Sequence, residues 1–201
     1  MNWLAHVFLS EADVEFRLGN LLADVVRGPA REAMTAAFRA GAARHHAIDK
    51  FTDAHEVVRR SRARVEQEHR RFSGVLVDVF YDYLLATRWD RYSTQPLDEF
   101  TSKFYADMQS RALPVPEQAQ AMLDRIVRHD LLGSYRTPAG VERSLRRISI
   151  MLASRWQREF ALERSVPNLI ENEADYARDF EEFFPQLQAH VAAMASTPER
   201  K

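Results

Sequence analysis

The sequence predicts an all-α protein, a single compact domain of about eight helices. Apolar residues recur at helical spacing along nearly the whole chain, no segment alternates like a β-strand, and no Asn-Gly hairpin dipeptide occurs. Only six glycines and eight prolines interrupt the 201 residues, so the intervals between breaks are long enough for helices of several turns.

Recognisable breaks divide the first half of the chain into helices. A broad apolar face predicts a helix from Val14 to Arg27, where Gly28 ends it, and Pro29 suits the first turn of the helix that follows. The next three segments are alanine-rich, highly charged and almost continuously apolar, and their helices are expected at residues 31–54, 56–71 and 75–89.

Prolines and a glycine-containing loop delimit the helices of the second half. Pro114 and Pro116 break the chain, and Pro185 is expected to kink the last long helix near its end. The helices are expected at residues 96–111, 117–129 and 141–160 and from residue 167 onward. A single domain therefore covers residues 1–195, and residues 196–201 are expected to form a frayed tail.

Composition excludes several classes of protein. Hydrophobic residues make up 46% and charged residues 28%, as in an ordinary soluble globular domain rather than a disordered chain. A net charge of −1 argues against a protein that coats nucleic acid. Cysteine is absent, so the chain has no thiolate nucleophile and a metal site must use nitrogen and oxygen ligands.

The chain shows no targeting or membrane segment. Acidic residues follow the first apolar stretch, which has no basic region before it, so a secretory signal is not expected. No apolar run approaches the roughly 20 residues that span a bilayer. We therefore expect a cytoplasmic protein with no membrane partner.

Pairs of potential ligand residues recur at a spacing of four. On a helix this spacing places both members of a pair on one face, one turn apart. Asp53 extends the third pair by a further turn, and His46 lies close to the same side. The four pairs, each on a predicted helix, are Asn2/His6, Asn20/Asp24, His45/Asp49 and Asp78/Asp82.

The Asp78/Asp82 pair is the sharpest of these signals. The two aspartates are the only charges in the apolar helix around residues 75–86, and such a helix is normally buried. A buried carboxylate must be paired, protonated or bound to a metal. We favour a metal or catalytic role, and the alternative is neutralisation by an arginine such as Arg27 or Arg44.

The other pairs carry both functional and structural interpretations. Arg27 is near enough to neutralise Asp24, and a histidine in an apolar stretch, as His6 is, is most often a hydrogen-bonded core residue. His45 and Asp49 form a reasonable metal-binding pair on a helix. Imidazole and carboxylate ligands together favour manganese, iron, zinc or magnesium.

The dipeptide His129-Asp130 is a literal His-Asp motif, as in the metal-dependent HD phosphohydrolases. It lies at the end of a predicted helix and has no partner histidine nearby in the sequence. We interpret it as structural, with the histidine complementing the helix dipole.

Arginines gather in one short segment. Only Glu56, Glu66 and Glu68 oppose them, so the segment is either a solvated charged helix or a dock for an acidic partner. The arginines are Arg59, Arg60, Arg62, Arg64, Arg70 and Arg71.

The order and spacing of these motifs resemble the bacterial acyl carrier protein phosphodiesterases. The resemblance is specific over roughly the first 90 residues, and later segments at 151–155 and 183–185 are also similar. It is carried by Asn2-x-Leu4-Ala5-His6, Gly19-Asn20-Leu21-Leu22-Ala23-Asp24-x-Val26-Arg27-Gly28, His45-x-x-Ile48-Asp49-x-x-Thr52-Asp53 and Asp78-Val79-x-x-Asp82.

The resemblance implies an all-helical hydrolase, distantly related to the HD phosphohydrolases, that uses a divalent metal, typically manganese. Its reaction would remove 4′-phosphopantetheine from holo-acyl carrier protein and leave the apo-protein. Carried over from the family pattern are His6, Asn20, Asp24, His45, Asp49, Asp53, Asp78 and Asp82.

These residues receive expected roles. We expect His6, His46, Asn20 and Asp53 to be catalytic, with either histidine protonating the departing serine oxygen. Arg27 or Arg44 would bind the phosphate, and the segment from Arg59 to Arg71 would dock the carrier protein. The metal ligands are expected among Asp24, His45, Asp49, Asp78 and Asp82, with Mn²⁺ ahead of Mg²⁺, Fe²⁺ and Zn²⁺.

The chain departs from the family pattern at two positions. His46 stands where an arginine is expected, and Tyr83 stands where a histidine is common. Two other functions stay open on the sequence alone. One is an HD-like phosphohydrolase acting on a nucleotide or small phosphoester, and the other is a helical binding protein whose buried aspartates form structural ion pairs.

Overall fold

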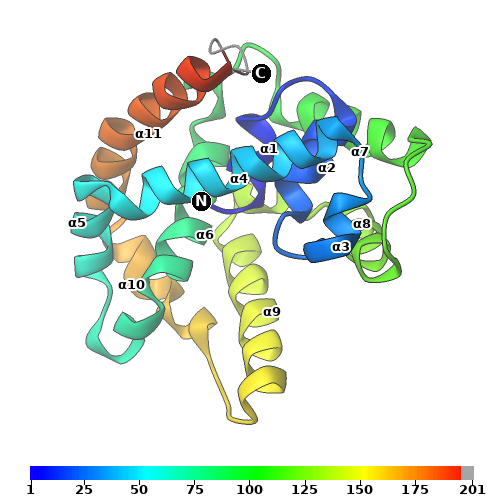
Figure 1. The fold of residues 1–201 in the computed structure, drawn as a ribbon. Coiled ribbons are helices and arrows are strands. Elements are labelled where there is room, and N and C mark those ends of the chain that lie inside the picture. Colours follow the sequence, from blue (N-terminus) through cyan, green and yellow to red (C-terminus); the bar gives the residue numbers. More distant parts are fainter. Residues whose placement is uncertain (196–201) are drawn as a thin grey trace.

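The computed structural model describes residues 1–195 and confirms the all-α prediction. These residues form eleven α-helices and four short 3₁₀ helices, with no β-strand among them (Figure 1). In the same range, no helix is long and apolar enough to cross a membrane. The predicted tail lies outside the described residues.

The helices follow one another through short connections. In the first half of the chain they are α1 (Trp3–Phe8), α2 (Val14–Leu22), α3 (Gly28–Glu32), α4 (Ala36–Ala54), α5 (Glu56–Arg64), η1 (Gln67–Phe72) and α6 (Ser73–Thr87). In the second half they are η2 (Trp89–Arg91), α7 (Leu97–Ser110), α8 (Glu117–Arg128), η3 (Gly133–Arg136), α9 (Pro138–Trp156), η4 (Leu162–Ser165), α10 (Val166–Glu171) and α11 (Glu173–Ala195).

Helix α6 forms the centre of the core. Nearly all of its side chains from Leu76 to Ala86 are buried, and it packs against α1, α5, α9 and α11. An apolar helix that is covered on every side is the expected location for a continuous hydrophobic segment. Burial of this helix is what removes Asp82 from water.

Helices α2 and α4 approach each other backbone to backbone. A side-chain carbon on Gly19 of α2 would collide with the carbonyl of Phe38, and one on Gly41 of α4 would collide with the carbonyl of Phe16. Glycine permits this close approach because it has no Cβ. The contact places the C-terminal half of α4, with His45, beside the helices that carry the first two sequence motifs.

Two predicted helices are shorter or divided in the structure. The helix expected over 31–54 is divided into α3 and α4, and the hydroxyl of Thr35 caps α4 by accepting from the backbone N–H of Phe38 at 3.2 Å. The charged helix expected over 56–71 ends at Arg64 and continues as the 3₁₀ helix η1. A Thr N-cap is a start signal for a new helix, and it explains the first difference.

The last predicted helix is also divided. It consists of α10 and α11, which meet at Asn172, and Pro185 lies inside α11, which remains one helix through it. Helix α9 is expected at 141–160 but runs from Pro138 to Trp156, and in the view of Figure 1 its C-terminal half extends away from the body of the molecule.

The helix expected to end at Arg27 ends at Leu22. Val25 and Val26 turn back onto the carbonyl of Leu22, and the guanidinium of Arg31 donates to the carbonyl oxygens of Ala23 and Val26 at 2.5 and 2.9 Å. These bonds satisfy carbonyls that the end of a helix leaves free. Asp24 therefore lies in a turn rather than on α2.

Candidate metal centre

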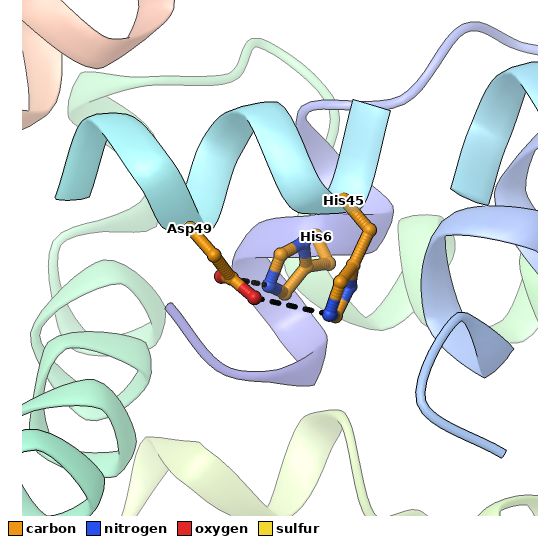
Figure 2. A group of neighbouring side chains, drawn as sticks. All are labelled: His6, His45 and Asp49. Atoms are coloured by element: carbon orange, nitrogen blue, oxygen red, sulfur yellow. Dashed lines mark ion pairs between the residues drawn. The ribbon is translucent and has the colours of Figure 1, made fainter. Parts of the chain in front are cut away.

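Two histidines and one aspartate from separate parts of the sequence meet between α1 and α4. The Nε2 atom of His45 lies 3.1 Å from Oδ2 of Asp49, one turn along α4, and Nε2 of His6 on α1 lies 3.2 Å from Oδ1 of the same carboxylate. The two imidazole rings are stacked with centroids 4.1 Å apart. Figure 2 shows both rings directed at this carboxylate, and one ligand atom from each residue lies within 4.8 Å of the others.

Asn20 sets the orientation of the His6 ring. Its amide nitrogen donates to the backbone oxygen of His6 at 3.0 Å and to the Ser10 hydroxyl at 2.8 Å, so its amide oxygen faces Nδ1 of His6, 2.8 Å away. Because that oxygen can only accept, Nδ1 of His6 carries the proton. The lone pair of His6 therefore lies on Nε2. Asn20, predicted to be catalytic, thus contacts His6 in the structure.

The lone pair of His6 faces oxygen atoms rather than donors. His6 is 1% exposed, and burial lowers its pKa, so the ring is neutral. Its Nε2 lies 3.2 Å from Oδ1 of Asp49 and 3.2 Å from the carbonyl oxygen of Met1. Either a bound cation or a second proton on the ring would satisfy acceptors that converge in this way.

Several polar atoms of the cluster have no hydrogen-bond partner in the described structure. They are both ring nitrogens of His45 and Oδ1 of Asp49, all buried. Buried polar atoms are nearly always satisfied, so a group of buried atoms without partners calls for an explanation. Imidazole nitrogen and carboxylate oxygen are ligands that suit a divalent transition metal such as Mn²⁺, and the residues present fit such an ion.

The carboxylate of Asp49 is held in its charged form. Burial by itself raises its pKa, but the contacts with His45 and His6 and the charge of the Met1 amine outweigh burial and lower the pKa well below its usual value. A carboxylate that stays ionised in this position is a competent metal ligand at neutral pH.

Asp78 of α6 lies beside the cluster. Its Oδ1 is 3.2 Å from the amine of Met1, and the same amine lies 3.5 Å from Oδ1 of Asp49. Burial opposes the charge of this amine, but Asp78, Asp49 and Asp82 outweigh burial, so its pKa is raised. A positive charge is therefore already favoured between these carboxylates.

Asp82, predicted as a metal ligand, caps helix α1. Its two carboxylate oxygens accept from the backbone N–H groups of Leu4 and Ala5 at 2.7 and 3.1 Å. Burial raises its pKa to about 7, against the lowering effect of these two bonds. Neither Arg27 nor Arg44 neutralises the Asp78/Asp82 pair. The charged Met1 amine lies beside Asp78, and the backbone N–H groups at the start of α1 bind Asp82.

Asp24 lies between Arg27 and the cluster. Its Oδ1 accepts from Arg27 at 2.7 Å, and its Oδ2 lies 3.6 Å from Nε2 of His45. The side chain of Asp24 is 65% exposed, so it lies at the outer edge of the cluster. From there it can reach either an ion or a bound ligand.

Arg31 is a residue of this region that the sequence analysis missed. Its guanidinium fastens the turn that carries Asp24 and lies 3.2 Å from Nε2 of the exposed His46. Together with Arg27 it gives the open side of the cluster positive charge. No spacing signal indicates Arg31, because it reaches this position from the separate short helix α3.

Two predicted site residues, Asp53 and Arg44, make their contacts elsewhere, and so does Asn2 of the first spacing pair. Asp53 pairs with Arg62 at 2.6 Å, whereas Arg44 lies 3.6 Å from Glu11. Asn2 donates to the Tyr135 hydroxyl at 2.9 Å rather than to the cluster.

Two further motifs have structural surroundings. Asp130 accepts from the Tyr105 hydroxyl at 3.0 Å and from the backbone of Gly133, and His129 ends α8, as the structural interpretation of this dipeptide expects. Tyr83, which departs from the family pattern, makes its contact elsewhere. Its hydroxyl donates to Glu173 at 2.9 Å.

Half of the arginine-rich segment is paired within the molecule. Arg60 donates to Asp179 and Glu182 of α11, Arg64 donates to Asp179, and Arg62 binds Asp53. Within residues 1–195 the other three arginines, which are exposed, form no ion pair. They are Arg59, Arg70 and Arg71.

A comparison with models of protein families shows which family the chain belongs to. The family model described as acyl carrier protein phosphodiesterase matches residues 1–187. The chain belongs to this family. His6, His45 and Asp49 lie inside the matched region, and the predicted resemblance to the family is confirmed.

Relatives named acyl carrier protein phosphodiesterase cover nearly the whole chain. The one from Photorhabdus laumondii is 29% identical over 93% of this chain and 93% of its own length. The one from Serratia proteamaculans is 32% identical over 93% of this chain and 95% of its own. The one from Escherichia coli O157:H7 is 30% identical over 97% of this chain and 100% of its own.

No solved structure matches this member of the acyl carrier protein phosphodiesterase family. The distant relation to the HD phosphohydrolases therefore stays a prediction.

Proposed function

We propose that this protein hydrolyses the phosphodiester that joins 4′-phosphopantetheine to a serine of holo-acyl carrier protein, with a divalent metal as cofactor. The observation that carries the proposal is the convergence of His6, His45 and Asp49, whose ligand atoms lie within 4.8 Å of one another, together with the buried atoms of His45 and Asp49 that have no hydrogen-bond partner among the described residues. Membership of the family supplies the substrate, since the relatives are named for this activity.

The ion would be held by Nε2 of His6, a ring nitrogen of His45 and the carboxylate of Asp49. Asp24 and Asp78 lie close enough to complete or adjust the set. A divalent ion in such a site lowers the pKa of water and polarises a phosphoryl oxygen. Among the ions that suit these ligands, Mn²⁺ is the first choice.

The chain's own residues then bind and orient the phosphodiester. Arg27 and Arg31 give the open side of the cluster positive charge, where they can hold phosphate oxygens. Because both ring nitrogens of His6 are engaged, by Asn20 and by the cluster, His46 is the histidine left to give a proton to the departing serine oxygen.

The test is the intact mass of the carrier protein. Incubation of the holo-carrier protein with this enzyme and Mn²⁺ is expected to remove the mass of the phosphopantetheine arm, and chelation of the metal should stop the loss. In ¹⁸O-labelled water the label should enter the released phosphopantetheine, because water attacks phosphorus and the bond from phosphorus to the serine oxygen breaks.

Two results would contradict the proposal. The first is an unchanged carrier mass with metal bound to the enzyme. The second is rapid hydrolysis of free nucleotides with no action on the holo-carrier protein, which would establish the other phosphohydrolase activity instead.

A further inference from the structure

The exposed face of α9 combines arginines with large apolar residues. Successive members are four, three, one and four residues apart, so they fall within about 140° of the helix circumference. We call this set the α9 stripe, and it consists of Arg143, Arg147, Ile150, Met151 and Arg155.

The apolar members of the α9 stripe are unusually open to water. Ile150 is 64% and Met151 is 61% exposed, and with Trp156 at the end of the same helix they are the large hydrophobic residues most exposed in residues 1–195. A soluble protein rarely leaves such residues grouped on one element without a partner.

The arginines of the α9 stripe have no acidic partner among the described residues. Arg147 donates to the hydroxyl of Ser144 at 2.8 Å, and neither Arg143 nor Arg155 forms an ion pair in this range. By contrast, Arg146, which lies one helical turn before Ile150, is paired with Glu142 at 2.7 Å. The arginines of α9 that lack an acidic partner within residues 1–195 are thus the three members of the α9 stripe that lie around the exposed apolar residues.

The α9 stripe begins beside the metal centre. Asn2, next to the Met1 amine, donates to the hydroxyl of Tyr135, which contacts Ser144, and Ser144 accepts from Arg147. Tyr135 and Ser144 are buried, so these polar contacts run through the interior. From this start α9 extends away from the body of the molecule (Figure 1).

We propose that the α9 stripe is the docking surface for the carrier protein, and that it binds an acidic helix with apolar residues between its carboxylates. This inference rests on the proposed function. When charges of opposite sign on two partners meet around a small apolar centre, they orient the partners, and the apolar contact adds affinity. Since the bond to be cleaved joins the arm to the carrier's own serine, the carrier's surface must come up to the metal, and the α9 stripe begins there.

The arginine-rich segment at 59–71 is a weaker candidate for the same role. Arg60 and Arg64 are already bound to a buried carboxylate, Asp179, and Arg62 is bound to Asp53. A partner would have to displace those pairs. The arginines of the α9 stripe could bind a partner without displacing an existing ion pair.

The experiment measures binding without turnover. Metal-free protein, kept so by a chelator, is titrated into fluorescently labelled holo-carrier protein, and the Kd is taken from the anisotropy. R143E/R155E is expected to raise the Kd about tenfold at about 0.05 M salt, and the difference should shrink as salt screens the charges. R128E/R164E, which changes the net charge equally at exposed sites outside the α9 stripe, should change the Kd less than about twofold.

A second variant tests the apolar part of the surface. I150S/M151S is expected to raise the Kd about three- to fivefold at every salt concentration, because a lost apolar contact is not screened. Both positions are exposed, so circular dichroism and the Tm should match those of the unaltered protein. If R143E/R155E fails to fold, R143Q/R155Q gives the same comparison with a smaller change in charge.

Three outcomes would overturn the α9 stripe as the dock. They are a Kd of R143E/R155E equal to that of the unaltered protein, a larger loss in R59E/R70E than in R143E/R155E, and equal losses in R143E/R155E and the control R128E/R164E. Failure of the proposed function is distinguishable, because it shows as an unchanged carrier mass in the hydrolysis test and leaves the Kd measurable.

Discussion

Two aspartates in this molecule each lie among basic side chains, and their surroundings differ in one decisive respect. Asp179 of α11 accepts from Arg60, Arg64 and the hydroxyl of Ser61, so its charge and both of its oxygens are matched. Asp49 of α4 faces Nε2 of two imidazoles at 3.1 and 3.2 Å, and among the described residues its Oδ1 and both ring nitrogens of His45 have no hydrogen-bond partner.

Asp179 belongs to a closed cluster, in which its polar atoms are all matched. Asp49 belongs to an open cluster, in which some polar atoms have no hydrogen-bond partner in the part of the chain that the structure describes. Asp179 is 1% exposed, and Ser61 relays its network to Tyr81, whose hydroxyl lies 2.8 Å away. Nothing in that cluster needs a further ion. The comparison teaches that burial and charge alone do not distinguish a site from a scaffold, whereas unsatisfied ligand atoms do.

The largest expected effect is at the open cluster. D49N should lose metal-dependent hydrolysis of the holo-carrier protein, because an amide is a poorer ligand than a carboxylate for a hard divalent ion. The unaltered protein should gain about 2.7 kcal/mol of stability from Mn²⁺ at a hundred times its Kd. D49N should show almost no metal-dependent rise in Tm, as measured by calorimetry. A normal rise in D49N would remove Asp49 from the metal centre.

The closed cluster should respond in the opposite way. D179A removes the buried carboxylate that accepts from Ser61 and from the partly exposed Arg60 and Arg64, and loss of hydrogen bonds to a charged group costs about 1.5–3 kcal/mol. Denaturant unfolding should show this loss with and without Mn²⁺. Any protein that remains folded should keep its metal affinity. A selective loss of metal binding in D179A would break the distinction between the two clusters.

A smaller effect is expected from the residue that orients His6. N20A removes the acceptor of the His6 Nδ1 proton and should weaken metal binding about 10- to 100-fold, as loss of such partners typically does. S10A is the matched control, since it removes a partner of Asn20 and leaves both ring nitrogens of His6 untouched. Isothermal titration with Mn²⁺ measures both variants, and equal affinities would exclude the positioning role.

The smallest effect is expected at Asp53. Its carboxylate is exposed and paired with Arg62, and exposed pairs contribute about 0.2–1 kcal/mol. D53N should therefore change the Tm only slightly and should keep activity within about twofold of the unaltered protein. A large loss of activity at unchanged Tm would support the catalytic role that the sequence assigns to this residue.

Much of this arrangement could be predicted from spacing within single helices. The pair His45/Asp49 lies on one face of α4 as expected, and the apolar segment of α6 is buried as its composition indicates. Periodicity reports which residues share a face, and that information is local.

What could not be predicted depends on contacts between helices. The sequence does not show that Asn20 faces His6, that Asp82 caps α1, or that Asp179 lies opposite the arginine-rich segment. Each of these facts requires knowing which elements are neighbours in space. Thr35 was a local signal for a helix start that alanine-rich periodicity on both sides concealed.

The close contact between α2 and α4 at two glycines has a consequence for the geometry of the His6/His45/Asp49 cluster. Gly41 lies one helical turn before His45, and Gly19 directly precedes Asn20, which orients His6. The close approach of α2 and α4 therefore positions Asn20, and through it the His6 ring of α1, relative to His45. A single methyl group at either glycine would lie 1.9 Å from a backbone oxygen of the facing helix. The shift needed to relieve that contact exceeds the tenths of an ångström by which ligand distances differ between Zn²⁺ and Ca²⁺, so the cluster would be disturbed without altering any ligand.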